Sequence, residues 1–257
     1  VLETEGSEIM DYLTEVWETM EKAILDGVQT EGQLPGGLGL QRKASTYFVK
    51  SKGYQGSMKS RALIYSYALA VAEQNSSGGK IVTAPTCGSC GVIPGVLYHL
   101  KENHQCSTQR ILNALATAGL IGNIIKQNAS VSGAEVGCQG EIGAACAMAA
   151  GAACQLFGGS PQQIEYAAEM GLEHHLGLTC DPIGGLVQVP CIERNAFAAA
   201  RALDSCSFAM LSDGKHMVSF DKVVKTMKQT GHDLPSLYKE TSTGGLAVFV
   251  KKDNLQE

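Results

Sequence analysis

The sequence has no cluster of basic residues. Its 20 Lys and Arg are outnumbered by 25 Asp and Glu, which gives a formal net charge of -5 over 257 residues. Proteins that bind nucleic acids concentrate Lys and Arg on the surface that faces the phosphates. The composition therefore argues against a DNA or RNA partner.

A membrane-spanning segment is also missing. The uncharged run that contains residues 142–160 is rich in Ala and Gly and is followed by Pro161-Gln162-Gln163, whereas a spanning helix needs roughly 20 predominantly apolar residues. We expect it to form a buried helix. Nine cysteines are too few, and odd in number, for a disulfide scaffold, and Val1 opens on polar sequence without a signal peptide. These features predict a protein of the reducing cytoplasm.

Strand patterns are scarce, since only residues 81–84 and 246–250 qualify. Helical spacing is common: apolar residues recur every three or four positions from Ser7 to Asp26, with Gly27 as the expected stop. The fold is predicted to be all-α, with Ala- and Gly-rich helices packed closely in a single domain, 1–257, that includes a connector-like loop region at 28–61. Further helices are expected over 63–73, 93–100, 110–127, from near 134, and over 142–156, 160–175, 193–210 and 221–228, the last stopped by Gly231.

Three cysteines differ from the rest in their surroundings. Cys180 precedes Asp181-Pro182 and Cys191 follows Pro190, so both lie where regular backbone breaks, and Cys138 lies in a run rich in Gly. A metal-binding thiolate needs a loop or helix end, where backbone amides can face the sulfur. Their spacing alone is a weak signal, because it forms no compact CxxC pattern. Three other thiols lie in helical runs and are expected to fill core space: Cys146, Cys154 and Cys206.

The CxxC pair Cys87 and Cys90 has no second pair to complete a zinc site. The pattern is more typical of a Gly-rich bend whose amides and Thr86 hydroxyl face a small anion. His174 and His175 are adjacent, so both cannot face one site on a helix. His175 is an open candidate for the surroundings of the metal.

Several segments together resemble a known family. They are residues 84–86, 132–141, 177–182, 189–196, 240–242 and 244–247. In this order they resemble the catalytic (alpha) domain of the iron-sulfur L-serine dehydratases, and they cover most of the chain. The resemblance implies a [4Fe-4S] cluster held by Cys138, Cys180 and Cys191, with one iron left open.

The resemblance also implies a site for the substrate. Ser130 and Ser132 are the candidate catalytic residues, and the candidate substrate-binding residues are Thr86, Asn128, Gly133 and Arg194. Arg194 is expected to pair either with the substrate carboxylate or with a neighbour of the cluster. The implied reaction converts L-serine through aminoacrylate to pyruvate and ammonia, in amino-acid degradation and gluconeogenesis. No phosphate-binding glycine loop with a nearby Lys follows a strand, which disfavours pyridoxal phosphate.

The family also carries a beta chain or smaller domain with a Ser-Ser-Ser-His-Thr segment at the active site, and this segment is absent here. We therefore expect a beta partner that completes the site, and a homo-oligomer. Two alternatives stay open. A related iron-sulfur lyase that acts on threonine or cysteine would keep every motif, and a non-catalytic helical module would instead hold a structural zinc with four ligands.

Overall fold

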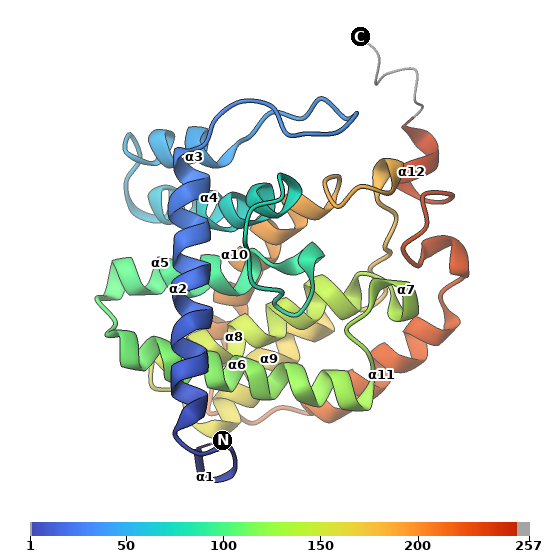
Figure 1. Cartoon of the computed structure of the whole chain (residues 1–257). Coiled ribbons are helices and arrows are strands. Elements are labelled where there is room, and N and C mark those ends of the chain that lie inside the picture. Colours follow the sequence, from blue (N-terminus) through green and yellow to red (C-terminus); the bar gives the residue numbers. More distant parts are fainter. Residues whose placement is uncertain (1, 251–257) are drawn as a thin grey trace.

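The computed structural model describes residues 2–250, which form helices joined by loops and short turns (Figure 1). The helices are α1 (Leu2–Glu5), α2 (Glu8–Gln29), α3 (Ala44–Ser51), α4 (Gly56–Ser76), α5 (Val92–His104), α6 (Thr108–Asn128), α7 (Gly133–Val136), α8 (Ala144–Leu156), α9 (Pro161–Glu173), α10 (Cys191–Met210), α11 (Phe220–Asp233) and α12 (Leu246–Phe249). Shorter turns are η1 (Cys87–Ser89), η2 (Gln139–Gly143), η3 (Ile183–Gly185) and η4 (Ser236–Tyr238). The predicted all-α class is confirmed.

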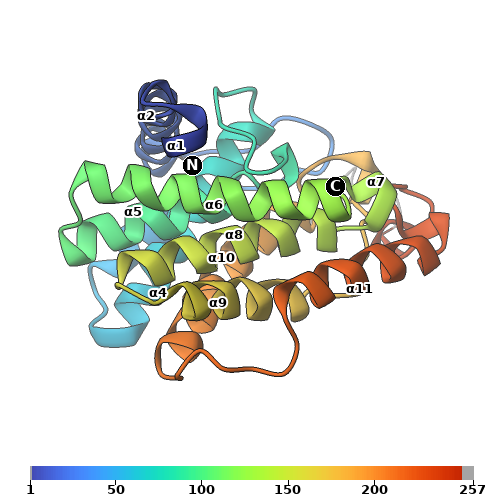
Figure 2. The same cartoon turned by 90° about the horizontal axis from the view of Figure 1, so that it is seen from below.

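Helix α8 forms the centre of the fold. Nearly all of its residues are buried, because α5, α6, α9 and α10 pack around it (Figure 2). Helix α2 stands across the ends of α5 and α6 on one side of this group (Figure 1). A helix that is apolar on every face belongs in the interior, so the Ala-rich composition of this run explains its central position.

Glycines allow the helices around α8 to approach closely. A Cβ placed on Gly151 of α8 would lie 2.3 Å from Cδ1 of Ile121 in α6. On the other side, a Cβ on Gly171 of α9 would lie 3.0 Å from the backbone of Ala147. A side chain at Gly151 would force Ile121 to move, and one at Gly171 would press on the backbone of α8, so the small residues permit the close spacing of the helices.

Two glycines that were expected to stop helices do not stop them. Helix α2 continues through Gly27 to Gln29, and α11 continues through Gly231 to Asp233. A Cβ on Gly27 would lie 2.5 Å from the carbonyl oxygen of Ala70, and one on Gly231 would lie 2.6 Å from Cβ of Val136. Each glycine therefore serves close helix packing, and the prediction that they end helices was wrong.

The two strand patterns do not form strands. Residues 246–249 form α12, and residues 81–84 are extended or bent loop. Within residues 2–250 the only β pairing consists of two isolated bridges, Gln33 with Gln41 and Cys180 with Lys239. Both patterns are short, and among the described residues no neighbouring strand is available to pair with them. Residues 28–61 are also not loop throughout, because they contain α3 and the start of α4.

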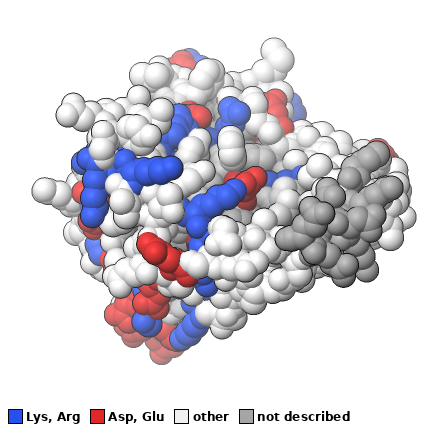
Figure 3. All heavy atoms as spheres, turned by 90° about the horizontal axis from the view of Figure 1, so that it is seen from above, with Lys and Arg blue, Asp and Glu red and all other residues white. Residues whose placement is uncertain are grey.

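The capping signal at residues 160–163 was read correctly. Ser160 accepts a hydrogen bond from the backbone of Gln163, the Gln163 side chain bonds back to Ser160, and Pro161 begins α9. Among the described helices, none combines the length and apolarity that crossing a bilayer requires. On the face drawn in Figure 3, Lys and Arg are interspersed with Asp and Glu.

Candidate metal centre

The three predicted metal ligands come from three separate elements. Cys138 leads into η2, Cys180 lies in the loop between α9 and α10, and Cys191 is the first residue of α10. All three are buried, with exposed fractions of 2%, 4% and 9%. The sulfur atoms of Cys138 and Cys180 and one carboxylate oxygen of Glu141 all lie within 4.8 Å of one another. Cys191 lies outside this compact group, but close enough for the charge of Cys138 to affect its pKa.

The backbone around Cys138 leaves regular helix geometry at this point. Gly137 adopts a φ of 76°, which separates α7 from η2, and a Cβ on it would lie 2.8 Å from the Leu178 carbonyl oxygen. The carbonyl of Cys138 then accepts hydrogen bonds from the amides of Ile142 and Gly143, as a π turn requires. The result is a thiol at the start of a buried helix, beside the loop that carries Cys180.

The amide side chain of Gln139 links three parts of the chain around Cys138. Its exposed fraction is 0%. Its nitrogen donates to the carbonyl of Val136, and its oxygen accepts from the amide of Gly177 and the hydroxyl of Thr230. A buried amide with satisfied partners fixes geometry, because losing one partner leaves a desolvated polar group. Gln139 therefore holds the Cys138 and Cys180 loops in register, a role that sequence analysis missed.

The three thiols differ in acidity. A hydrogen bond from Cys180 and the charge of Arg194 lower the pKa of Cys138, although burial opposes them. The same contact, together with burial, raises the pKa of Cys180. The pKa of Cys191 is raised to about 12, mainly by burial and further by the charges of Cys138 and Glu141. A metal ion that binds all three thiols must therefore displace protons from at least two of them.

Glu141 is a second residue that sequence analysis missed, although it lies in the run that carries the resemblance. One carboxylate oxygen accepts a 2.6 Å hydrogen bond from the Thr86 hydroxyl, and the other accepts from the Cys180 thiol at 3.6 Å. Burial raises the pKa of Glu141, and the charge of Glu240 adds to this shift. The carboxylate thus connects the cysteines to the turn at Thr86.

A buried asparagine attaches that turn to α10. The oxygen of the Asn195 side chain accepts from the amide of Gly91, and its nitrogen donates to the carbonyls of Gly88 and Cys191. Thr86 itself caps η1 through reciprocal bonds with Ser89. The predicted Gly-rich bend therefore lies directly beside Cys191. Cys90 is buried, and burial raises the pKa of its thiol, so it is not a reactive partner for Cys87.

Of the remaining candidate residues, Gly133, Ser130 and Ser132 lie at or just before the start of α7, and Asn128 lies at the end of α6. Gly133 adjoins the cysteines, because a Cβ on it would lie 2.5 Å from a Glu141 oxygen and 3.0 Å from the Cys180 sulfur. The buried Ser130 hydroxyl accepts a hydrogen bond from the amide of Ser132, the N-cap residue of α7. Asn128 is exposed and donates to the carbonyl of Ile124 on its own helix. Its side chain is therefore not brought to the cysteines in this structure.

Arg194 lies beside the Cys180 loop. Its guanidinium donates to the carbonyl of Thr179 at 2.7 Å and to the Asp181 carboxylate at 3.4 Å. The other oxygen of Asp181 accepts from the amide of Leu246. Of the two predicted roles for Arg194, these contacts favour the neighbour of the metal centre, with the guanidinium already engaged.

The C-terminal segment covers Cys180. The amide of Cys180 donates to the carbonyl of Tyr238, and its carbonyl accepts from the amide of Glu240. His175 is half-buried on the other side, bonds to the carbonyl of Gly171, and packs against Gly143 at the end of η2. Burial lowers the pKa of His175, so its imidazole is held neutral. His174 is exposed and bonds to the carbonyl of Met170.

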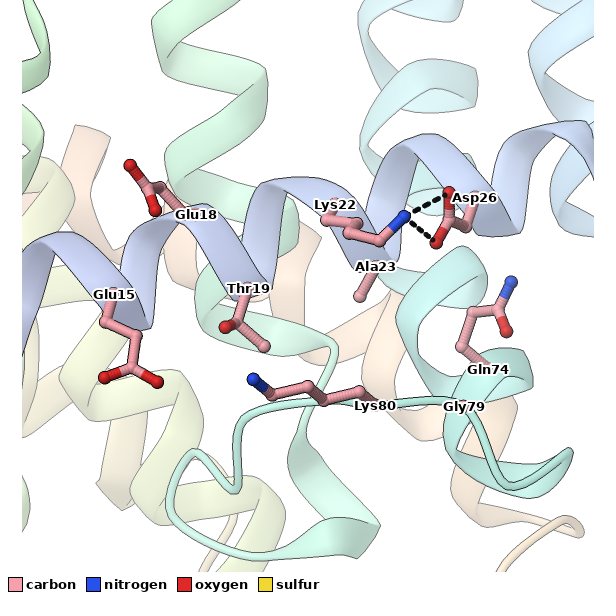
Figure 4. A pocket seen from close by; sticks show the side chains of 9 residues that line it. All are labelled: Glu15, Glu18, Thr19, Lys22, Ala23, Asp26, Gln74, Gly79 and Lys80. Atoms are coloured by element: carbon pink, nitrogen blue, oxygen red, sulfur yellow. Dashed lines mark hydrogen bonds and ion pairs between the residues drawn. The ribbon is translucent and has the colours of Figure 1, made fainter.

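A separate pocket of about 460 Å³ lies between α2 and the loop after α4 (Figure 4). Charged side chains of both signs line it, and Lys22 pairs with Asp26 at 2.9 Å in a largely exposed position. None of its lining residues is a cysteine or a histidine. The cysteine group is therefore the better candidate for a catalytic centre.

Comparison with known proteins agrees with this location. A family model described as "Serine dehydratase alpha chain" matches residues 3–247. The chain is 52% identical over 246 residues to an L-serine dehydratase of Streptomyces coelicolor, a match that covers 95% of this chain and 54% of that protein. It is 48% identical over 251 residues to L-serine dehydratase 1 of Escherichia coli, covering 96% of this chain and 55% of that protein. The chain spans about half the length of the curated relatives it matches.

Proposed function

Because this chain belongs to the serine dehydratase alpha-chain family, we propose that it is the metal-holding part of an enzyme that dehydrates L-serine. The reaction removes the Cα proton and the β-hydroxyl of serine as water and leaves 2-aminoacrylate. Aminoacrylate tautomerises and is hydrolysed to pyruvate and ammonia. The observation that carries this proposal is the convergence of Cys138, Cys180 and Glu141 within 4.8 Å, beside Cys191.

The donor set fits a [4Fe-4S] cluster with three protein ligands. Cys138, Cys180 and Cys191 would hold it, since all three thiols are buried on separate elements and lie close enough for the charge of Cys138 to act on both others. When bound, such a cluster supplies one iron without a protein ligand as a Lewis acid for the substrate hydroxyl. The Arg194 guanidinium offsets part of the negative charge that three thiolates bring into the interior.

The residues around the thiols bind and orient the amino acid in this proposal. Gly133 lets the chain approach Glu141 and Cys180 closely, since a Cβ on it would lie 2.5 Å from a Glu141 oxygen and 3.0 Å from the Cys180 sulfur. The Thr86 hydroxyl bonds to the same Glu141 carboxylate, and Ser130 and Ser132, which share a hydrogen bond, lie just before Gly133 in the chain. Thr86 contacts the substrate while Glu141 fixes its rotamer, and the two serines act on the substrate as hydrogen-bonding groups. Asn128 can join them only by exchanging its bond to Ile124.

A partner supplies the general base in this proposal. Abstraction of a Cα proton needs a base within hydrogen-bonding reach, and the Ser-Ser-Ser-His-Thr segment, which lies at the active site in the family, is absent from this sequence. The curated relatives are about twice the length of the matched region. The unmatched half, as a beta chain or domain with the Ser-Ser-Ser-His-Thr segment, would complete the site.

A structural zinc is the second candidate, and one observation favours it. Glu141 offers a carboxylate within 4.8 Å of two thiols, so Cys138, Cys180, Cys191 and Glu141 could supply the four ligands of a closed tetrahedral site. Metal analysis of anaerobically purified protein separates the two candidates. About four irons with matching sulfide per chain support the cluster, whereas one zinc without sulfide would refute it.

Substrate choice needs its own experiment, performed on this chain together with the proposed partner domain. Pyruvate from L-serine supports the proposal, and 2-oxobutyrate from L-threonine at a higher kcat/KM would instead support a threonine lyase. Release of sulfide from L-cysteine in preference to turnover of serine would support the third possibility. Absence of turnover for all three amino acids, with the cluster present, would contradict a lyase of this class.

A further inference from the structure

Helix α10 and the helical segment that ends in α8 each carry a cysteine near both ends. Cys138 and Cys191 lie at the start of these elements, in the candidate metal centre, and Cys154 and Cys206 lie near their ends. At 1.5 Å per residue, the 15 steps from Cys191 to Cys206 along α10 amount to about 22 Å. Cys154 and Cys206 are therefore remote from the candidate metal centre, and the proposed function does not use them.

These two thiols meet a thioether. The Cys154 sulfur lies 3.5 Å from the sulfur of Met210, the last residue of α10. Cys154 also shares a hydrogen bond with Cys206, which lowers the pKa of Cys154 and raises that of Cys206. Both thiols are buried, with exposed fractions of 0% and 1%, while Met210 is half-buried and reaches toward the surface. Three sulfur atoms thus gather at the junction of α8, α10 and the loop before α9.

The backbone at Gly159 packs directly against the sulfurs. A Cβ on Gly159 would lie 2.5 Å from the Cys154 sulfur and 3.0 Å from the Met210 sulfur. Its φ lies outside the left-handed region, unlike that of Gly158 at 83°. Glycine is therefore required at position 159 for space and not for backbone conformation. Any side chain at this position would displace one or both sulfurs, so glycine allows the sulfurs and the chain to pack together.

We propose that Cys154, Cys206 and Met210 form a second, all-sulfur site that binds a soft monovalent cation of the Cu(I) class. Thiolate and thioether ligands select Cu(I) over harder ions. Two sulfurs that each lie about 2.3 Å from one ion are roughly 3.5–4 Å apart, and the Cys154–Met210 separation already meets this condition. On binding, the two thiols lose their protons to solvent and form two copper–thiolate bonds, and the thioether adds a third bond without a change of charge.

The site that results carries one net negative charge, from two thiolates and one monovalent cation. Arg110 stands at this end of α8, where its guanidinium donates to the carbonyl of Leu156, two residues after Cys154. Its positive charge lowers the cost of the buried anionic site. No step of this proposal depends on serine turnover or on the iron-sulfur cluster.

The test is an anaerobic Cu(I) titration of the full chain against the chelator bicinchoninate. To remove the first centre, the titration is repeated in a background with Cys138→Ala, Cys180→Ala and Cys191→Ala. We expect one tight equivalent of Cu(I) in this background, weakened at least about 100-fold by Cys154→Ser or Cys206→Ser. The matched control is Cys146→Ser, because Cys146 is also fully buried on α8. Equal Cu(I) binding by Cys154→Ser and Cys146→Ser would overturn the site.

Two further variants keep both thiols, in case the cysteine changes prevent folding. Met210→Leu conserves volume and should lower the number of sulfur neighbours of copper from three to two in X-ray absorption spectra. Gly159→Ala places a methyl group against the Cys154 and Met210 sulfurs and should weaken Cu(I) binding by about tenfold. A sulfur count that Met210→Leu leaves unchanged would contradict the third ligand, and full affinity in Gly159→Ala would contradict a site at these sulfurs.

Discussion

The hydroxyl of Thr86 donates a 2.6 Å hydrogen bond to the carboxylate of Glu141, 55 positions later in the chain. The other oxygen of the same carboxylate accepts from the thiol of Cys180. One side chain therefore spans the gap between the turn expected to bind substrate and the loop expected to bind metal. Glu141 therefore fixes the position of Thr86 relative to Cys180.

Our first prediction concerns this bridge. Thr86→Val keeps the shape of the side chain but removes the hydroxyl, which leaves a Glu141 oxygen without its donor. Such a loss costs about 1–3 kcal/mol, so kcat/KM for the dehydration should fall roughly 5- to 100-fold while iron content stays constant. Ser76→Ala is the control, since its hydroxyl also bonds to carbonyls but lies away from the cysteines. An unchanged kcat/KM in Thr86→Val would remove Thr86 from the substrate site.

The second prediction tests the metal ligands. Cys138→Ala, Cys180→Ala and Cys191→Ala should each abolish the brown colour and the bound sulfide of anaerobically prepared protein, because a three-thiolate cluster cannot lose a ligand. Cys146→Ala should keep both, although Cys146 is as deeply buried as the other three. Visible absorption and iron analysis measure the result, and circular dichroism verifies the fold. Full colour in Cys191→Ala would instead favour the compact group of Cys138, Glu141 and Cys180.

The third prediction compares two helix glycines. Gly27→Ala should lower the free energy of unfolding by about 1–3 kcal/mol, because the new methyl group would lie 2.5 Å from the Ala70 carbonyl oxygen. Gly119→Ala in α6 meets no atom within 4 Å and should raise it by roughly 0.5–1 kcal/mol. Urea denaturation of both variants measures the difference. Stabilisation by Gly27→Ala would show that α2 and α4 can separate without cost.

The fourth prediction concerns Glu169 on α9, whose exposed fraction is 2%. The pKa of Glu169 is raised from 4.5 to about 7, mainly by burial. The charges of Glu173 and Glu165 add to this shift, and His216 opposes it. Between these values the folded protein binds more protons than the unfolded chain, so stability falls as pH rises from 4.5 to 7. Glu169→Gln should therefore stabilise the protein at pH 8 by on the order of 1 kcal/mol, and by little at pH 4. Exposed Glu18→Gln is the control, and an equal effect at both pH values would contradict the shift.

The positions of most helices could be predicted from the sequence, because periodic apolar spacing and capping residues act over only a few neighbouring positions. Ser160, Pro161 and Gln163 predicted the start of α9 from three neighbouring side chains. Gly27 and Gly231 misled the same reasoning, since a glycine can end a helix or admit a neighbour. Only the position of Ala70 or Val136 in space distinguishes the two roles.

The site was predicted only in part, for a similar reason. The cysteines were recognisable from the residues beside them and from a family resemblance. Gln139, Glu141 and Asn195 lie in the same runs, but their roles depend on partners such as Thr230, Thr86 and Gly91, which are 91, 55 and 104 positions away. No spacing rule contains that information. The sulfur group of Cys154, Cys206 and Met210 escaped prediction in the same way, because each residue alone is typical of a helix core.

The last prediction concerns the proposed partner domain. This chain alone should assemble the metal centre but turn over L-serine slowly, because a positioned general base contributes about 10²- to 10⁴-fold to rate and the Ser-Ser-Ser-His-Thr segment that we propose to supply it is absent from this sequence. Addition of the partner domain with the Ser-Ser-Ser-His-Thr segment should raise kcat by this factor, while the same domain with its histidine changed to Ala should bind without restoring activity. Pyruvate formation measures the rate. High activity of the isolated chain that is lost in His175→Ala, but not in the exposed control His174→Ala, would place the base in this chain and contradict the need for a partner.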